Sequence, residues 1–136
     1  MILVDTNVLL DVLTDDPAWA NWSQQQLNAA ALRDRLAINP VVYAEVSSRF
    51  DQIEDLDAML TSAGLAVAEM SRSTLFFAGH VFKAYRRRGG ARTSILPDFF
   101  IGAQAAVLGA PLITRDVRRY RTYFPTIELI VPEPPS

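Results

Sequence analysis

The chain has 136 residues, of which 50% are hydrophobic and 10% aromatic, and its 13 Lys+Arg and 15 Asp+Glu give a formal net charge of −2. This length suits one compact domain that buries roughly two-thirds of the surface of its unfolded chain, and so much apolar material excludes intrinsic disorder. The lack of cysteine excludes disulfide scaffolds, thiolate zinc sites, iron–sulfur clusters and thiol nucleophiles, and it fits a reducing cytoplasm.

Short apolar runs alternate with helical patterns along the whole chain. The expected strands are residues 2–4, 36–38, 66–68, 112–114 and 127–131. The expected helices begin near residue 8 and at the Asp16-Pro17 pair, and then span 41–50, 51–63, 71–88, 98–108 and 116–123. The Gly89-Gly90 pair is expected to end the helix before it, and an irregular loop is expected to follow through Pro97. This order predicts an α/β domain over residues 1–131, with a mostly parallel sheet of four to five short strands flanked by helices, and a Pro-rich tail at 132–136.

The apolar opening segment is not a membrane span. Asp5 and Asp11 interrupt it, no Lys or Arg precedes it, and no cleavage site of small residues follows it. No apolar run approaches the ~20 residues that a bilayer span requires. We therefore expect a cytoplasmic protein that has no membrane association.

The charges are unevenly distributed. Residues 1–69 carry eleven acids and three bases, whereas residues 70–136 carry four acids and ten bases. All the bases except Lys83 are arginines, whose guanidinium groups match phosphate oxygens. The basic second half therefore indicates either phosphate recognition or ordinary solvated helix faces.

Acidic residues follow the ends of the expected strands. Asp5 comes directly after the first strand, Asp116 follows the fourth, Asp98 begins the helix that leads into the fourth, and Glu45 lies on the helix after the second. The carboxyl ends of parallel strands meet at one edge of the sheet, so these carboxylates are candidates for one shared site. Crowded carboxylates are commonly neutralised by a hard divalent cation, here Mg²⁺ or Mn²⁺.

A structural interpretation stands beside the metal interpretation. Asp5, Asp98 and Asp116 each occupy a position where an aspartate can cap the N-terminus of a helix, and Glu45 can point to solvent. Spacing alone leaves the two interpretations open.

Two sequence stretches and one helical acid resemble a known family. The opening MILVDTNVLLDVL, the acid Glu45 and the segment LPDFFIGAQAAVLGAPLITRD resemble PIN-domain ribonucleases, and more closely the VapC-type toxins of bacterial toxin–antitoxin pairs. The resemblance implies a single PIN-like domain that cleaves structured RNA with Mg²⁺ or Mn²⁺ and inhibits translation. It also implies a cognate antitoxin and a homodimer.

The resemblance also assigns roles to residues. It implies metal-binding and catalytic roles for Asp5, Glu45, Asp98 and Asp116. It implies weaker roles beside the metal or substrate for the polar motif positions, which are Asn7, Thr114 and Arg115. Many relatives carry a further acid at the position of Arg119, which puts full occupancy of a second metal in doubt.

Several residues around these acids have alternative interpretations. Arginines that flank Asp98 and Asp116 are candidates for RNA phosphate contacts; they are Arg86, Arg87, Arg88, Arg92 and Arg115. Tyr120 is expected in the core, and Tyr123 is a possible stacking surface for a base. Trp19 and Trp22 are expected either in the core or in a groove for a partner helix. His80 is expected to be packed or partly exposed.

Two other functions are open from the sequence. The first is a phosphotransferase of haloacid-dehalogenase type, whose aspartyl nucleophile also follows the first strand, although this chain has Asn7 where that chemistry places a second acid. Lys83 is also poorly placed for it. The second is a non-catalytic α/β module that binds other proteins.

Overall fold

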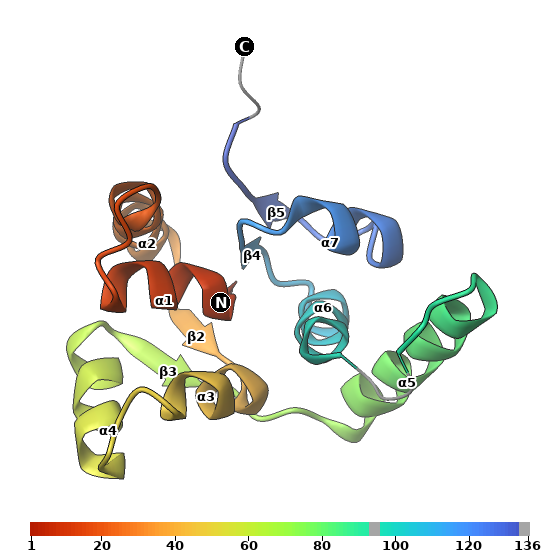
Figure 1. Cartoon of the computed structure of the whole chain (residues 1–136), viewed down its shortest axis with the longest axis horizontal. Coiled ribbons are helices and arrows are strands. Elements are labelled where there is room, and N and C mark those ends of the chain that lie inside the picture. Colours follow the sequence, from red (N-terminus) through yellow and green to blue (C-terminus); the bar gives the residue numbers. More distant parts are fainter. Residues whose placement is uncertain (93–95, 134–136) are drawn as a thin grey trace.

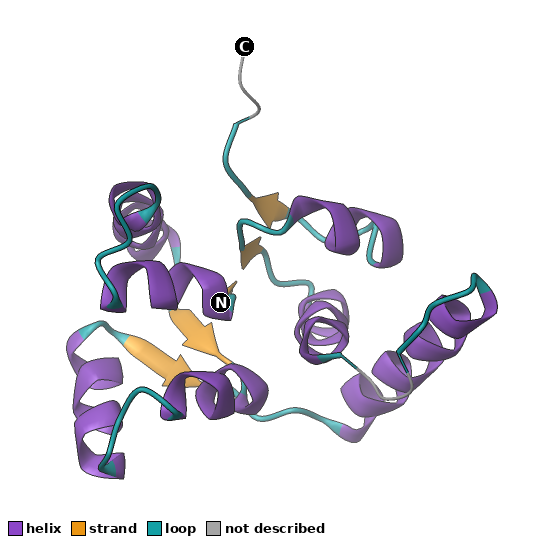
Figure 2. Ribbon diagram, viewed as in Figure 1, coloured by secondary structure: helices purple, strands orange, loops and turns teal. Residues whose placement is uncertain are grey.

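The computed structural model describes residues 1–92 and 96–133. At its centre is a parallel sheet of five short strands in the order β3-β2-β1-β4-β5 (Figure 2). The strands are β1 (Ile2–Val4), β2 (Leu36–Ile38), β3 (Leu65–Val67), β4 (Leu112–Ile113) and β5 (Leu129–Ile130). The α/β class and the parallel sheet are as predicted.

Seven helices connect these strands within the described residues. They are α1 (Thr6–Leu13), α2 (Ala20–Arg33), α3 (Pro40–Ser47), α4 (Ile53–Ser62), α5 (Arg72–Arg87), α6 (Pro97–Leu108) and α7 (Val117–Tyr123). Helix α6 contacts α3, α5 and α7. Helix α5 forms the outer edge of the molecule on the right of Figure 1. The close approach between α6 and the segment after α7 requires glycine, because a Cβ at Gly102 would lie 2.4 Å from the Phe124 ring.

Most predicted elements are present, with shifted ends. Helix α2 begins at Ala20 and not at the Asp16-Pro17 pair, because the Asp16 side chain accepts hydrogen bonds from the backbone N–H groups of Ala18 and Trp19 and forms a turn there. Strand β3 begins one residue earlier than predicted, and β5 is shorter. The loop predicted before Pro97 includes residues 93–95, and the predicted tail includes 134–136; both segments lie outside the described residues.

The order of the strands fixes where a site can form. The chain runs from β1 outward through β2 and β3, and then returns to the other side of β1 with β4 and β5. Ligands of open α/β sheets bind at such a switch point, beyond the carboxyl ends of the strands. Here the switch lies between β1 and β4, where the backbone N–H of Asp5 donates to the carbonyl of Ile113 at 3.0 Å.

None of the helices in the described part of the chain combines the length and apolar character needed to cross a membrane.

Candidate metal and catalytic site

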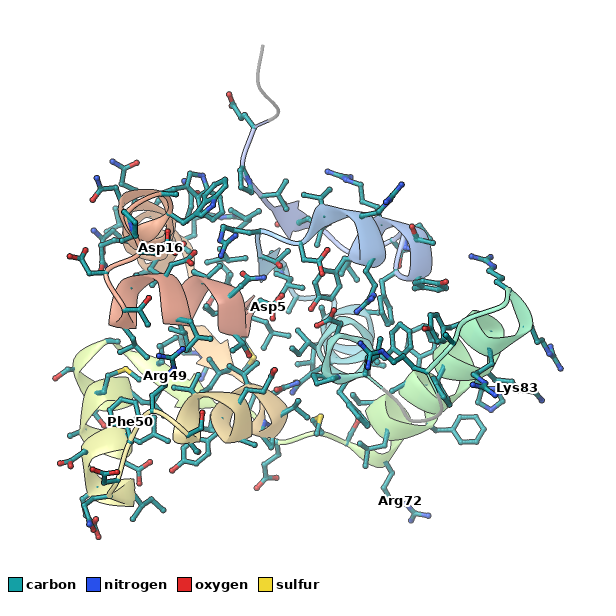
Figure 3. The ribbon with its side chains drawn as sticks, viewed as in Figure 1. Asp5, Asp16, Arg49, Phe50, Arg72 and Lys83 are labelled. Carbon is teal, nitrogen blue, oxygen red and sulfur yellow. The ribbon has the colours of Figure 1, made fainter. Side chains whose placement is uncertain are left out.

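Asp5 lies at the centre of the site and is 4% exposed. Its Oδ2 accepts hydrogen bonds from the Thr114 hydroxyl at 2.7 Å and from the Tyr120 hydroxyl at 3.0 Å, while its Oδ1 accepts from the backbone N–H of Thr6 at 2.8 Å. Figure 3 shows Asp5 near the middle of the molecule, at the beginning of α1. A side chain directly after β4 and one from α7 therefore fix the orientation of the first acid of the motif.

The electrostatic surroundings of Asp5 oppose its ionisation. Burial raises the pKa of the Asp5 carboxyl to about 6; the Thr114 hydrogen bond opposes this shift, and the negative charge of Asp98 adds to it. Burial also raises the pKa of the Tyr120 hydroxyl well above its usual value, as do the charges of Asp5, Asp98 and Asp116. Asp116 also raises the pKa of Asp98, so Asp98 lies within electrostatic range of both Asp5 and Asp116.

Asp98 pairs with an arginine of α7. The Arg119 Nη1 donates to Asp98 Oδ2 at 2.8 Å, and the two side chains are 37% and 24% exposed. Burial raises the pKa of the Asp98 carboxyl, the Arg119 guanidinium opposes that shift, and the charge of Asp116 reinforces it. Asp98 is thus one member of the acidic cluster that already has a cationic partner.

Helix capping does not account for these acids as a group. The cap residue of α6 is Leu96, with Pro97 and Asp98 in the first turn, so the prediction that Asp98 caps this helix is wrong. Asp116 stands at the cap position of α7, but its side chain makes no capping hydrogen bond. Asp5 does cap α1 through the N–H of Thr6. Two of the three aspartates therefore have no capping role that explains their position.

Glu45 approaches the cluster from another helix. It is an exposed residue of α3, and its Oε1 accepts a hydrogen bond from the Thr6 hydroxyl at 2.8 Å. Because the Thr6 N–H donates to Asp5, Thr6 bridges the two carboxylates. Glu45 is thereby joined to the site through one intervening residue.

The polar motif residues form a network around the strand ends. The Asn7 Nδ2 donates to Thr114 Oγ1 at 3.3 Å and, weakly, to Asp5 Oδ2 at 3.4 Å. The Thr114 hydroxyl oxygen accepts from the backbone N–H of Asp116 at 3.0 Å, and the backbone N–H of Arg115 donates to Asn7 Oδ1 at 3.2 Å. These bonds hold the segment after β4 against the start of α1.

The guanidinium of the partly buried Arg115 is paired with a buried carboxylate. It pairs with both oxygens of the buried Asp11 carboxylate at 2.7 and 2.8 Å, and it lies 4.9 Å from the centre of the Trp19 ring. Ser23 adds a third hydrogen bond to Asp11, at 2.7 Å. A phosphate contact by Arg115 stays a prediction, and this pair gives the residue a structural task as well.

The donor chemistry of the cluster fits a hard divalent cation. Asp5, Asp98 and Asp116 offer only carboxylate oxygens, which are the ligands that Mg²⁺ and Mn²⁺ prefer. In the described ranges no three acidic, histidine or cysteine side chains are placed as a ready metal site. Two of the carboxylates already have partners in the protein, because Arg119 pairs with Asp98 and two hydroxyls donate to Asp5. Mg²⁺ often binds through one or two carboxylates and keeps several waters, so the donor set is sufficient.

A surface cleft of about 310 Å³ opens beside Asp116. Its lining residues are Tyr85, Asp116, Arg118, Arg119, Thr122 and Tyr123. The Arg88 guanidinium lies 5.6 Å from the centre of the Tyr123 ring, and the Arg86 Nη1 donates to the carbonyl of Arg92 at 2.6 Å. Arg86, Arg87, Arg88 and Arg92 are exposed. Arginines thus stand near the rim of a cleft that reaches the acidic cluster, and their contact with RNA stays a prediction.

The remaining aromatic residues have structural environments. Tyr120 is fully buried, which confirms its expected place in the core. Trp19 and Trp22 are both half-buried and meet edge to face with their ring centres 6.0 Å apart. His80 is exposed, more so than the packed or partly exposed position expected, and its ring centre lies 4.3 Å from that of Phe76.

Three contacts of the site were missed from sequence. They are the Arg119–Asp98 pair, the Tyr120 hydrogen bond to Asp5, and the Thr6 hydrogen bond to Glu45. Helical spacing indicated only that Arg119 and Tyr120, three and four positions beyond Asp116, lie on the same side of a helix as Asp116; it did not indicate their partners Asp98 and Asp5.

Comparisons with known proteins agree with this architecture. The model of the family described as PIN domain matches residues 2–125. A search of curated proteins finds no match.

Solved structures share the fold. The VapBC2 complex of Rickettsia felis bound to a promoter DNA fragment is 20% identical over 98% of this chain and 100% of that chain, with a TM-score of 0.74. VapBC-1 of nontypeable Haemophilus influenzae is 20% identical over 96% of this chain and 98% of that chain, with a TM-score of 0.69. A toxin–antitoxin complex of Klebsiella pneumoniae is 22% identical over 96% of both chains, with a TM-score of 0.64. The family match spans most of the chain and the fold agrees with it, so this protein belongs to the PIN domain family.

Proposed function

We propose that this protein is a metal-dependent endoribonuclease whose metal-binding and catalytic residues are Asp5, Glu45, Asp98 and Asp116. The observation that carries the proposal is the burial of Asp5 at the switch point of the sheet, within range of the charge of Asp98, which in turn lies within range of the charge of Asp116. Grouping these carboxylates costs folding free energy, and a divalent cation would offset that cost. PIN domain membership supports a nuclease over other uses of such a site.

The residues of the chain would divide the work. Thr114 and Tyr120 orient the Asp5 carboxylate, and Thr6 holds Glu45 toward it. When bound, Mg²⁺ or Mn²⁺ would supply Lewis-acid chemistry, polarising a phosphoryl oxygen and lowering the pKa of an attacking water. The residues around the site would then hold the scissile phosphodiester beside these acids.

The proposed substrate is structured RNA. The cleft beside Asp116 contains Arg118 and Arg119 together with two tyrosines, and this mixture suits phosphate contacts and base stacking. Arg86, Arg87, Arg88 and Arg92 would extend the basic surface at its rim. Cleavage of such RNA would inhibit translation.

We further propose that the chain is the toxin of a toxin–antitoxin pair. The solved complexes of similar fold are toxin–antitoxin complexes, which supports an antitoxin as partner. An apolar groove of about 420 Å³ between α1, α2 and α4, lined by Leu9, Val12, Leu27 and Met59 among others, suits an apolar segment of that antitoxin. A homodimer is proposed on the resemblance, and the molar mass in solution tests it.

Cleavage assays test the nuclease proposal. The purified protein is incubated with a structured RNA in Mn²⁺ or Mg²⁺, and in EDTA. Cleavage that requires the metal and is lost in Asp98→Asn but kept in Asp51→Asn supports the proposal, because Asp51 is an exposed carboxylate outside the site. Metal-dependent cleavage that survives Asp98→Asn contradicts the assigned site, and no cleavage of any RNA tested contradicts the activity.

An assay with a phosphate monoester in place of RNA distinguishes the proposed nuclease from the alternative phosphotransferase. That chemistry needs a second acid where Asn7 makes its hydrogen bonds, and a lysine near the nucleophile, whereas Figure 3 places Lys83 on the outer helix α5, away from Asp5. Turnover of a phosphate monoester through a covalent aspartyl phosphate would favour it. Absence of both activities would favour a protein-binding module.

A further inference from the structure

Arg119 places a positive charge inside the acidic cluster. It lies on α7, three residues after Asp116, and its Nη1 is 2.8 Å from Asp98 Oδ2. The next residue, Tyr120, donates to Asp5. One turn of α7 therefore supplies a cation to one acid of the site and a hydroxyl to another.

A divalent ion bound at this cluster would compete with Arg119 for the Asp98 carboxylate. In the part of the chain that the structure describes, Arg119 is the cation that forms an ion pair with one of Asp5, Asp98 and Asp116. The pair is partly buried, so water screens it less than a surface pair. The Asp98 oxygen that accepts from Arg119 is one of the two oxygens that this carboxylate could offer to a metal.

We propose that Arg119 is a tethered cation that competes with the divalent metal for Asp98 and so sets the metal affinity of the site. This inference rests on the proposed function, because it needs the metal site of Asp5, Asp98 and Asp116. Without metal, Arg119 neutralises part of the cluster and keeps Asp98 in place. When metal binds through the Asp98 oxygen that faces Arg119, Asp98 must leave the guanidinium, and the metal must also tolerate a nearby positive charge. Both effects weaken metal binding relative to a chain that lacks Arg119.

Metal binding to matched variants tests the inference. Mn²⁺ affinity is measured by calorimetry, without RNA, for the unmodified protein, Arg119→Gln and Arg121→Gln. Arg121 is exposed on the same helix, so its replacement removes the same formal charge without touching Asp98. We expect Arg119→Gln to bind Mn²⁺ on the order of tenfold more tightly at low salt, and Arg121→Gln to change the affinity by less than about twofold.

A conservative variant and a stability measurement add independent readouts. Arg119→Lys keeps the charge but loses the planar guanidinium, so its Mn²⁺ affinity should lie between those of the unmodified protein and Arg119→Gln. The melting temperature of Arg119→Gln should be lower than that of the unmodified protein in EDTA, where Asp98 loses its partner. Mn²⁺ should then raise the melting temperature of Arg119→Gln by more than it raises that of the unmodified protein, because tighter binding stabilises the folded state more.

The outcomes are distinguishable. Equal or weaker Mn²⁺ binding by Arg119→Gln, with binding intact in the unmodified protein, overturns the inference and leaves the metal site standing. An equal gain in Mn²⁺ affinity in Arg121→Gln also overturns the inference, because the loss of any positive charge on α7 would then explain the effect. Absence of Mn²⁺ binding in every variant overturns the proposed metal site, and the inference with it.

Discussion

Replacing the Asp5 carboxyl with an amide should stabilise the metal-free protein at neutral pH. The Asp5 carboxyl has a pKa of about 6 in the folded protein, against an ordinary aspartate value of 3.8 that applies to the unfolded chain. The shift arises chiefly because the carboxyl is buried. Between these values the folded state binds more protons than the unfolded state, so the free energy of unfolding falls as the pH rises through this window. The cost of ionising Asp5 is absent below about pH 3.8 and fully present above about pH 6.

The magnitude follows from the size of the shift. A difference of about two pKa units corresponds to about 3 kcal/mol at pH 7.5, and about half of that cost is already present at pH 5. The amide in Asp5→Asn cannot satisfy the Thr6 N–H and both hydroxyls of Thr114 and Tyr120, which costs about 1 kcal/mol. The net gain at pH 7.5 is therefore about 2 kcal/mol, or about 6 °C in melting temperature.

Thermal unfolding in EDTA at pH 5 and pH 7.5 measures this effect. The stability advantage of Asp5→Asn over the unmodified protein should be larger at pH 7.5 than at pH 5 by about 1.4 kcal/mol. The hydrogen-bond cost cancels in this comparison because it is the same at both pH values. Asp51→Asn, on the exposed surface, serves as the control and should show no such change. An advantage of Asp5→Asn that is equal at the two pH values would refute the argument from burial.

Three other variants test separate parts of the site. Asp98→Asn should abolish RNA cleavage while the metal-free melting temperature holds or rises, because burial and Asp116 together make ionised Asp98 costly; a clear drop would contradict this. Tyr120→Phe should lower the free energy of unfolding by about 1–2 kcal/mol in denaturant titrations, since Tyr120 is buried and donates to a buried carboxyl; no change would mean that this bond contributes nothing. Simultaneous replacement of the arginines 86–88 by glutamine should weaken RNA binding and flatten its salt dependence, and an unchanged slope would place them away from the RNA.

The parts of the site that depend on local sequence were predictable. Residues 2–4 form a buried strand, and Asp5 follows it because an aspartate can end a strand and cap the helix that begins at Thr6. The parallel order of the strands then brings Thr114 beside Asp5, although 109 residues separate them. Strand–helix alternation was sufficient for this step, because it fixes which strand ends share an edge.

The capping preferences of single residues gave a wrong prediction for Asp98. Aspartate is a preferred capping residue, which favoured a cap there. Proline is better suited to the first helical position, so Pro97 makes Leu96 the cap and moves Asp98 into the first turn. The Asp98 side chain is thereby available to face α7.

The contacts between distant side chains were not predictable. Arg119 reaches Asp98 only because α7 packs against α6, and the angle between two helices does not follow from either sequence pattern alone. Arg115 was predicted beside RNA phosphate, yet its guanidinium is paired with Asp11, a residue 104 positions earlier. Both pairs depend on tertiary packing and so become visible only in the folded chain.

The proposed function requires that Asp5, Asp98 and Asp116, together with Glu45, hold one divalent ion. Crystals of the protein soaked in Mn²⁺ and measured at a wavelength where manganese scatters anomalously would test it directly. We expect an anomalous peak within coordination distance of carboxylate oxygens of Asp5 and Asp98, with the Arg119 guanidinium turned away from Asp98. A well-ordered map at saturating Mn²⁺ with no peak there, or with the Arg119–Asp98 pair intact and the ion bound elsewhere, would contradict it.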